Sequence, residues 1–376
     1  MSNDVMNNTT TEVFETKKGH VCIGLGNCGT AIIREIAVRK SLNDVDLYAV
    51  DSVISTTKLA HINRIHTIPI VTDNKEGSGR NRERGGEMYE AHEALHEFDQ
   101  MYRRCESAKT PIIVITSAAG GTGSGSTPKL CRTLIGASIP VIPIIVCPSM
   151  DDPTAYHLNN NDLFMELEEV GVTTYAVFRN VAGDSDYSPI NREIVDMIEI
   201  ILGKNYGPTT LDSIDESDLE AVLSTPGRFM AVTSKANDIT NLTREITRKM
   251  FTGFQPAWTD EEAQQYTFMT AFSLKSMFAG QDFKKVFDEV RARIYNWFDE
   301  YRHIEQADNG GEVEASIIIA GLPRPEIKMI QTEFNGAEGI GSGMKRASRP
   351  KFLTRKKTQS TGIDPSGKKT FTWSDK

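Results

Sequence analysis

The sequence predicts an α/β protein with a Rossmann-like, parallel-sheet nucleotide-binding domain. Short apolar runs alternate with amphipathic helical segments through the first half of the chain, and this order is typical of βαβ units. The apolar runs are uninterrupted, as in strands that are buried on both faces. Two of these runs end in glycine-rich turns that lead into helices, an arrangement by which α/β proteins bind phosphate.

The composition is that of a globular protein, with 376 residues of which 39% are hydrophobic and 25% charged. This length suggests two domains. No apolar run reaches the roughly 18 residues of a membrane span, and the polar start of the chain lacks the apolar core of a signal peptide. We therefore expect a cytoplasmic protein without direct membrane insertion. The five cysteines have no metal-ligand spacing, which predicts reduced thiols.

The charge is unevenly distributed along the chain. Residues 345–376 contain ten basic and two acidic side chains, so this tail carries +8, while the net charge of the whole chain is −9. The rest of the chain therefore carries −17, which argues against nucleic-acid binding over its general surface. The tail has the charge to bind DNA, a membrane or an acidic partner.

The second half of the chain has fewer strands than the first. A long helix is expected from residue 188 to 202, followed by helices at 237–251 and 283–305 and a closing strand at 312–322. This pattern predicts a smaller α/β domain with its own sheet. The expected organisation is a flexible or helical extension (1–18), a nucleotide-binding domain (19–187), a central helix and linker (188–212), a C-terminal domain (213–334) and a disordered basic tail (335–376).

The first glycine turn follows the strand at 20–25. Its sequence, Gly24-Leu25-Gly26-Asn27-Cys28-Gly29, matches G-x-G-x-x-G between a strand and a helix. The next strand ends at Asp51, where a dinucleotide-binding fold carries its ribose-binding acid. An NAD-dependent Rossmann oxidoreductase is therefore an alternative. It leaves the second glycine loop unexplained, and the sequence has no evident catalytic His or Tyr–Lys constellation for it.

The second glycine loop is the more informative one. Ala119-Gly120-Gly121-Thr122-Gly123-Ser124-Gly125 follows a buried strand and precedes a helix expected to begin at Lys129. Such small residues let a ligand approach the backbone, so that successive N–H groups and the helix N-terminus bind one anion. The predicted ligand is a phosphate chain, with additional hydrogen bonds from the Thr122 and Ser124 hydroxyls.

This loop resembles the glycine signature of the tubulin/FtsZ superfamily, G-G-G-T-G-[ST]-G, with Ala119 in place of the first glycine. Other segments follow in the family's order: a first nucleotide loop, a γ-phosphate loop, a ribose-side loop and two guanine-contacting asparagines. The resemblance implies a GTPase that binds GTP/GDP and Mg²⁺. The implied nucleotide-binding residues are Gly24, Gly26, Asn27, Cys28, Gly29, Asp51, Gly77, Ser78, Gly79, Arg80, Asn81, Ala119, Gly120, Gly121, Thr122, Gly123, Ser124, Gly125, Pro148, Asn180 and Asn191.

Two further acids match a second family motif, N-x-D-x-x-D, with Ser213 replacing its asparagine. The resemblance implies that Asp215 and Asp218 are catalytic and reach the nucleotide of the next subunit in a head-to-tail filament. Carboxylates there would orient the attacking water. From the residues alone, the same pair is also a common helix N-terminal cap, and that interpretation stays open.

Departures from the family pattern indicate which branch of the superfamily the chain resembles. Asp51-Ser52-Val53 stands where FtsZ has N-T-D, so the metal ligands are unknown, and the segment between Asn180 and Asn191 is shorter than in division FtsZ. This divergence resembles the plasmid and phage branches (TubZ and the phage tubulins). It implies plasmid or phage DNA segregation, with the tail at 345–376 binding a DNA-bound adaptor. An FtsZ-like division or phage-positioning filament and a non-polymerising nucleotide-binding regulator remain alternatives.

Overall fold

The computed structural model describes residues 19–53, 62–72, 77–109, 111–181, 186–207, 211–259, 261–262, 266, 268–292, 297–308, 310–325, 359–363 and 369–373. Backbone contacts divide the chain into residues 1–330 and residues 331–376. The N-terminal extension that we expected at 1–18 lies outside the described residues.

The first half of the chain forms the expected parallel sheet. Its strands follow the order β3-β2-β1-β4-β5-β6, and every neighbouring pair is parallel. The strands are β1 (His20–Leu25), β2 (Val45–Asp51), β3 (Ile65–Pro69), β4 (Ile112–Ser117), β5 (Val141–Cys147) and β6 (Thr174–Arg179). Because the strands run in one direction, the loops after them gather at a single edge, which is where such sheets bind ligands.

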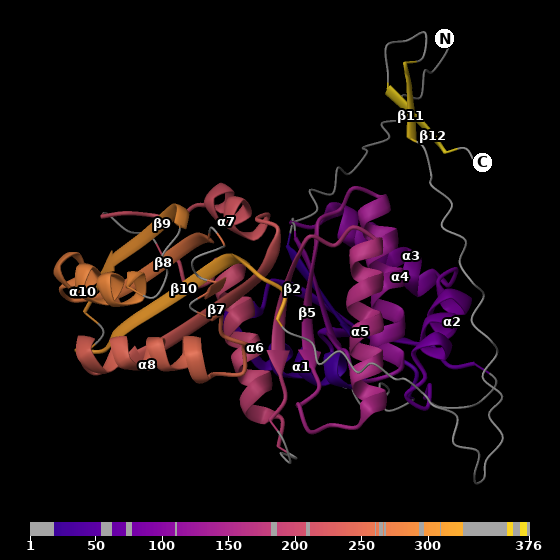
Figure 1. Cartoon of the computed structure of the whole chain (residues 1–376), viewed down its shortest axis with the longest axis horizontal. Helices are drawn as coiled ribbons and strands as arrows, with labels where there is room; N and C mark the ends of the chain where they lie inside the picture. The colour runs from indigo at the N-terminus through magenta and orange to yellow at the C-terminus, as the bar shows by residue number, and fades with distance from the viewer. Residues whose placement is uncertain are drawn as a thin grey trace, which may run out of the picture. The chain divides into compact units, whose positions relative to one another are not determined.

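Helices cover both faces of this sheet (Figure 1). Side chains alternate along each strand, so that Cys22 of β1 packs in the core with α1 and α6, whereas Val21 and Ile23 pack in the core with α2, α3 and α4. The helices are α1 (Gly26–Val38), the short 3₁₀ helix η1 (Lys40–Leu42), α2 (Arg82–His92), α3 (His96–Ser107), α4 (Thr122–Gly136), α5 (Thr154–Glu169), α6 (Ser188–Ile201) and α7 (Glu216–Leu223). The predicted central helix is therefore α6.

The second half of the chain extends the same sheet. Strand β7 (Gly227–Ala236) pairs in parallel with β6 through three residue pairs, and the order continues β7-β10-β8-β9. The remaining elements are α8 (Ile239–Thr252), β8 (Phe268–Ser276), α10 (Ala279–Arg291), β9 (Trp297–Gln306) and β10 (Val313–Leu322). Our expectation of a separate C-terminal sheet is therefore wrong, while the domain boundaries stay a prediction.

One predicted helix is only half correct. We expected residues 283–305 to be helical, but α10 ends at Arg291 and residues 297–306 form β9. This strand pairs with β8 along its whole length, from Phe268 opposite Trp297 to Ser276 opposite Gln306. The backbone groups of β9 are hydrogen-bonded to β8, although the helix α10 separates the two strands in the sequence. A partner so far away in the sequence cannot be recognised from the local spacing of apolar residues.

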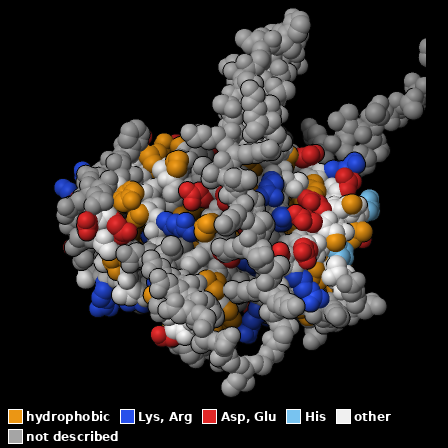
Figure 2. Space-filling view, turned by 45° about the vertical axis from the view of Figure 1, so that its right-hand side comes forward, with side chains coloured by type: hydrophobic (Ala, Val, Ile, Leu, Met, Phe, Trp, Pro, Cys, Tyr) orange, Lys and Arg blue, Asp and Glu red, His pale blue; other side chains and the backbone are white. Residues whose placement is uncertain are grey.

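The tail is described only at two strands, β11 (Gln359–Ile363) and β12 (Lys369–Trp373), which pair antiparallel. On the face in Figure 2, acidic and basic side chains are interspersed over the described surface. Cysteines 22, 28, 105, 131 and 147 are free, as expected. Within the described residues, no helix combines the length and the apolar character needed to cross a membrane.

Candidate functional site

A cavity of about 550 Å³ opens at the carboxyl ends of β1, β2, β4, β5 and β6. Each of these strands contributes its following loop, and the first turns of α1, α4 and α6 complete the lining. The parallel sheet thus brings together residues that lie up to about 165 positions apart, from Leu25 to Asn191. This is the binding edge that α/β sheets share.

The helices α1 and α4, which follow the two glycine-rich turns in the walls of the cavity, begin without side-chain caps. Helix α1 begins after Leu25 and α4 begins after Gly121, and neither of these residues makes a side-chain cap hydrogen bond. The first N–H groups of an uncapped helix need an outside acceptor, and the helix dipole favours an anion there. The two helix starts are close, because a Cβ on Gly26 would lie 2.9 Å from the Gly123 nitrogen. The pair therefore suits a chain of phosphates.

A row of hydroxyl groups joins three of the loops. The Thr122 hydroxyl lies 2.5 Å from that of Ser52 and donates to the Ser78 hydroxyl at 3.1 Å. From α5, the Asn159 side-chain amide donates to the carbonyls of Arg80 and Ala119, each at 3.1 Å. These contacts hold the loop at 77–81 against the glycine signature.

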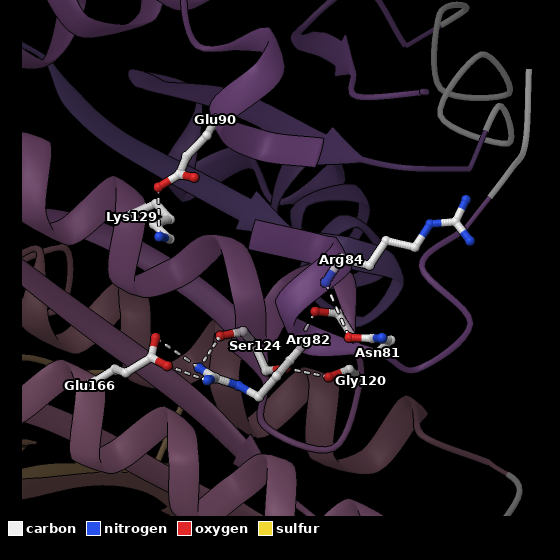
Figure 3. A network of polar contacts seen from close by, with 9 residues as sticks. Asn81, Arg82, Arg84, Glu90, Gly120, Ser124, Lys129 and Glu166 are labelled. Carbon is white, nitrogen blue, oxygen red and sulfur yellow. Dashed lines mark hydrogen bonds and ion pairs between the residues drawn. The ribbon is translucent and has the colours of Figure 1, made fainter. Parts of the chain in front are cut away.

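Arg82 supports the first turns of α4 (Figure 3). Proline at position 128 cannot donate to the carbonyl of Ser124, four residues earlier in the helix. The Arg82 guanidinium donates to this carbonyl at 3.0 Å and also forms two contacts with Glu166 of α5, at 2.5 and 3.2 Å. An arginine from a neighbouring helix thus replaces the hydrogen bond that proline removes.

The far end of the cavity is lined by Asn180, Tyr187, Ile190 and Asn191. The side-chain carbonyl oxygen of Asn180 is buried and has no hydrogen-bond partner in the described part of the chain. A buried acceptor of this kind normally has a donor. This end of the cavity therefore offers apolar and aromatic surface with amide groups, as a flat heterocyclic base requires.

Most of the predicted nucleotide-binding residues line this cavity. They are Gly26, Asn27, Cys28, Asp51, Gly77, Ser78, Gly79, Arg80, Ala119, Gly120, Gly121, Thr122, Gly123, Asn180 and Asn191. The cavity also has lining residues that the sequence analysis missed. These are Leu25, Ala31, Ser52, Val53, Ser117, Val146, Asp152, Tyr156, Tyr187 and Ile190. Asp152 and Tyr156 follow β5 in the segment that we associated with Pro148 alone, and Tyr187 lies one helical turn before Asn191.

Two predicted glycines have a packing role instead. Gly24 and Gly29 do not line the cavity, because α1 approaches the sheet at this point. A Cβ on Gly24 would lie 2.5 Å from the Gly29 carbonyl carbon, and a Cβ on Gly29 would lie 2.4 Å from the Ile115 carbonyl oxygen. The third glycine of the G-x-G-x-x-G pattern has this helix–strand packing role in dinucleotide-binding folds too.

Four other predicted residues also lie outside the lining. Asn81 caps α2 by accepting a hydrogen bond from the Arg84 nitrogen. Ser124 is fully buried and donates to the Gly120 carbonyl, so its hydroxyl faces its own loop. A Cβ on Gly125 would lie 2.7 Å from the Gly86 nitrogen, which places Gly125 at the contact between α4 and α2. Pro148 is buried after β5.

Asp51 is the cavity residue best suited to a magnesium ion. It is 2% exposed, its Oδ1 accepts from the Ser52 nitrogen at 2.7 Å, and its Oδ2 has no partner in the described structure. Burial raises the pKa of Asp51 to about 6, although hydrogen bonds from two backbone N–H groups oppose this shift. The described residues contain no cluster of three or more metal-ligating His, Cys, Asp or Glu side chains. Mg²⁺ is commonly bound by one carboxylate together with phosphate oxygens of the substrate, and Asp51 would provide that carboxylate. The ion would neutralise phosphate charge there.

Asp215 and Asp218 form a capping box at the start of α7. The Asp215 carboxylate accepts from the nitrogens of Ser217 and Asp218 at 2.9 and 3.0 Å, and the Asp218 carboxylate accepts from the Asp215 nitrogen at 3.0 Å. Hydrogen bonds from Ser217 and Asp218 lower the pKa of the exposed Asp215 carboxyl. The capping interpretation of the pair is thus correct.

This capping box lies at the opposite edge of the sheet from the cavity. Glu216, between the two acids, forms an ion pair with Lys109 at 3.3 Å. Lys109 precedes β4, and its backbone nitrogen donates to the carbonyl of Gly19, just before β1. The pair is therefore near the amino ends of the parallel strands, roughly 20 Å along a six-residue strand from the carboxyl ends. Asp215 and Asp218 cannot reach the cavity of their own subunit.

The fold and the cavity define an α/β nucleotide-binding protein with a phosphate site made of backbone amides. Residues 20–182 match the tubulin/FtsZ family GTPase domain. The part of the chain that forms the cavity is therefore a tubulin/FtsZ-family GTPase domain, and GTP hydrolysis is the general activity of that family. This assignment favours the GTPase prediction over the dinucleotide oxidoreductase.

Several solved structures share this fold. The GDP-bound CetZ1 monomer from Haloferax volcanii is 19% identical, with a TM-score of 0.63 over 81% of this chain and 95% of that chain. The GTPγS-form TubZ protofilament from Bacillus thuringiensis serovar israelensis is 19% identical, with a TM-score of 0.59 over 82% and 88%. The empty FtsZ dimer from M. jannaschii is 13% identical, with a TM-score of 0.62 over 82% and 93%. No curated protein matches the sequence.

Proposed function

We propose that this chain is a cytoplasmic GTPase that assembles head to tail into filaments and hydrolyses GTP between successive subunits. The observation that carries the proposal is the separation within one subunit of the nucleotide cavity and the Asp215/Asp218 pair. A second copy stacked along the strand direction would bring its acids to the open cavity. Such a contact joins two different surfaces, and heterologous contacts generate filaments.

The cavity supports GTP as the ligand. Its two uncapped helix starts suit the phosphates, and Asp51 suits Mg²⁺. The unpartnered Asn180 oxygen is an acceptor for the N–H groups on the edge of guanine. Likeness to the TubZ protofilament adds support for self-association, since that protein was observed as a protofilament in a GTPγS form.

In the proposed reaction, residues of this chain would bind the phosphates, stabilise their charge and orient the attacking water. Backbone amides of the glycine signature would hold the phosphates and stabilise the charge that develops on them. A carboxylate of the neighbouring subunit would orient the attacking water in line with the terminal phosphate. Bound Mg²⁺ would supply further charge neutralisation. Hydrolysis would then require subunit contact, so it would be slow in the monomer.

The cellular role that we propose is plasmid or phage DNA segregation. The support is the +8 charge of residues 345–376, which suits an adaptor–DNA complex, together with the likeness to TubZ. An FtsZ-like division filament remains the alternative. Co-sedimentation of filaments with the adaptor–DNA complex distinguishes the two roles, because a division protein would not bind that complex.

A mixing experiment tests the shared active site. Asp215→Asn with Asp218→Asn leaves the cavity intact. Gly120→Asp adds a carboxylate at the phosphate end, where a Cβ has no neighbour within 4 Å. We expect each variant alone to hydrolyse GTP slowly. Their mixture should recover activity, because Gly120→Asp subunits supply carboxylates to the intact cavities of the other variant.

The matched control is Gly136→Asp, at the end of α4, where a Cβ also has no neighbour within 4 Å. This variant should keep full activity, since Gly136 does not line the cavity. A mixture no faster than the sum of its components would contradict the shared site. Absence of any GTP-dependent rise in light scattering at micromolar wild-type protein would contradict filament formation itself.

A further inference from the structure

A fully buried arginine lies where the two halves of the sheet meet. Arg228, on β7, is 1% exposed, and it stands opposite Tyr175 of β6 and Leu322 of β10. Its Nε donates to the Pro323 carbonyl at 3.2 Å, whereas its Nη1 is buried and has no hydrogen-bond partner in the described structure. Buried polar groups normally have such a partner. Arg228 therefore presents a charged donor without an acceptor.

The Arg228 guanidinium is charged at neutral pH. Burial lowers its pKa to about 10, which is still well above neutrality. No carboxylate of the described residues lies within ion-pair distance of this side chain. Glu262 is the acid that acts on it electrostatically, but the Glu262 carboxylate accepts from the Thr259 nitrogen at 2.7 Å. A buried charge without a counter-ion is costly, so an anion that paired with Arg228 would stabilise the folded chain.

Two further arginines lie on the same face of the sheet. Arg179 ends β6, and alternation along this strand places its side chain on the face of Tyr175. Arg324 follows β10, one residue after the carbonyl that accepts from Arg228. Burial raises the pKa of the Cys147 thiol, and the guanidinium groups of all three arginines partly oppose this rise. The three positive charges therefore gather near this thiol, on the face of the sheet that α5 covers.

The contacts of Arg324 are weak. Its Nη1 lies 3.8 Å from the carboxylate of Glu168, whose side chain is 81% exposed. Its guanidinium carbon lies 4.7 Å from the centre of the Phe164 ring. Exposed contacts of both kinds contribute little. The Arg324 side chain is itself 37% exposed, so it can leave these contacts to admit a small ion.

We propose that Arg179, Arg228 and Arg324 bind one phosphate-sized oxyanion, at a site separate from the nucleotide cavity. A tetrahedral dianion has enough oxygens for several guanidinium groups and two charges to set against three. Because Nη1 of Arg228 is buried, the ligand is a small free ion rather than a phosphate group on a large molecule. The ion would link β6, β7 and the end of β10. It would thus strengthen the junction of β6 and β7, which pair through three residue pairs.

The test measures the binding of radiolabelled inorganic phosphate by equilibrium dialysis, with a non-hydrolysable GTP analogue filling the nucleotide cavity. We expect wild type to bind one phosphate per subunit. Arg228→Met should weaken phosphate binding at least about tenfold. In phosphate-free buffer, this variant should be at least as stable to heat as wild type, because it removes a buried charge that lacks a counter-ion.

Arg324→Gln is the second variant, since a partly exposed side chain is not required for folding. It should weaken phosphate binding about threefold or more. Arg39→Gln is the matched control, because the Arg39 side chain is also 37% exposed but pairs with Asp196 of α6 at 2.6 Å. It removes the same charge and should leave the phosphate affinity unchanged.

Two results would overturn the inference: no phosphate bound by wild type when the cavity is filled, or equal phosphate binding by wild type and Arg228→Met. Glycerol phosphate should compete at least about tenfold more weakly than phosphate, and equal competition would overturn the assignment to a free ion. Failure of wild type to bind the GTP analogue would instead contradict the proposed function. The comparison of Arg228→Met with wild type would then still decide whether the anion site exists.

Discussion

The Arg82 contact makes a quantitative prediction about the start of α4. Replacing Arg82 with Met keeps most of the aliphatic side chain and removes the guanidinium. The lost hydrogen bond to the Ser124 carbonyl has a charged donor, and its loss costs about 1.5–3 kcal/mol. The ion pair with the half-exposed Glu166 adds less than about 1 kcal/mol. We expect Arg82→Met to lower the free energy of unfolding by about 2 kcal/mol.

Proline 128 provides the decisive second variant. In Pro128→Ala, the restored N–H of residue 128 can donate to the Ser124 carbonyl within α4. Loss of Arg82 then leaves this carbonyl satisfied. We therefore expect Arg82→Met to cost about 1 kcal/mol less in the Pro128→Ala background than in wild type. Urea unfolding of nucleotide-free protein, followed by circular dichroism, measures the free energy of unfolding of wild type, of the two single variants and of the double variant.

Lys129→Met is the control for removing a charge from the same helix. Lys129 pairs with Glu90 at 2.6 Å on a more exposed surface (Figure 3), so its loss should cost less than about 1 kcal/mol. Its cost should not depend on residue 128. If Arg82→Met costs the same with Pro or Ala at position 128, the arginine does not replace the missing helical hydrogen bond, and our account of this contact is wrong.

Three further predictions concern other parts of the chain. Asp215→Asn retains an oxygen that can cap α7, so filaments should form while GTP turnover falls roughly 100-fold; normal turnover in phosphate-release assays would remove Asp215 from the mechanism. Deletion of residues 345–376 should leave GTP turnover within about twofold and abolish co-sedimentation with the adaptor–DNA complex; retained binding would locate that contact elsewhere. His303 is buried, neither ring nitrogen has a partner in the described structure, and burial lowers its pKa. Glu305 and Asp212 partly oppose this shift, whereas Lys275 adds to it. The folded state therefore disfavours the proton, so stability is lost as pH falls below about 6.5. His303→Phe should reduce the change in urea midpoint between pH 7.5 and pH 5.5, and an unchanged pH dependence would exclude His303 as its source.

The parallel half of the fold was predictable because its signals are local. Each strand is a short apolar run, and each glycine turn stands between a strand and a helix. The start of α4 was less accessible, since glycines and Pro128 disfavour a helix before Lys129. The structure begins this helix at Thr122. Arg82 supplies the missing hydrogen bond from a distant segment, and the residues near Pro128 in the sequence do not indicate this contact.

The fold of the C-terminal half could not be predicted fully, because it depends on pairing between strands that are far apart in the sequence. Residues 297–306 have spacing that favours a helix, yet they form the edge strand beside β8. Similarly, a single sheet rather than two follows from the short β6–β7 pairing. In the cavity, Asp152 and Tyr156 were missed because they belong to no recognisable motif. Only the parallel arrangement of β5 beside β4 brings them to the phosphate loops.

In the head-to-tail filament that we propose, the position of the two acids at the amino edge of the sheet would determine how many active sites the filament contains. If each site needs a cavity from one subunit and carboxylates from the next, a linear filament of n subunits contains n − 1 complete sites. One end always has a cavity without acids, and the other end has acids without a cavity. Activity per subunit should therefore be half-maximal in a dimer and approach a plateau in long filaments, and the filament necessarily has a direction.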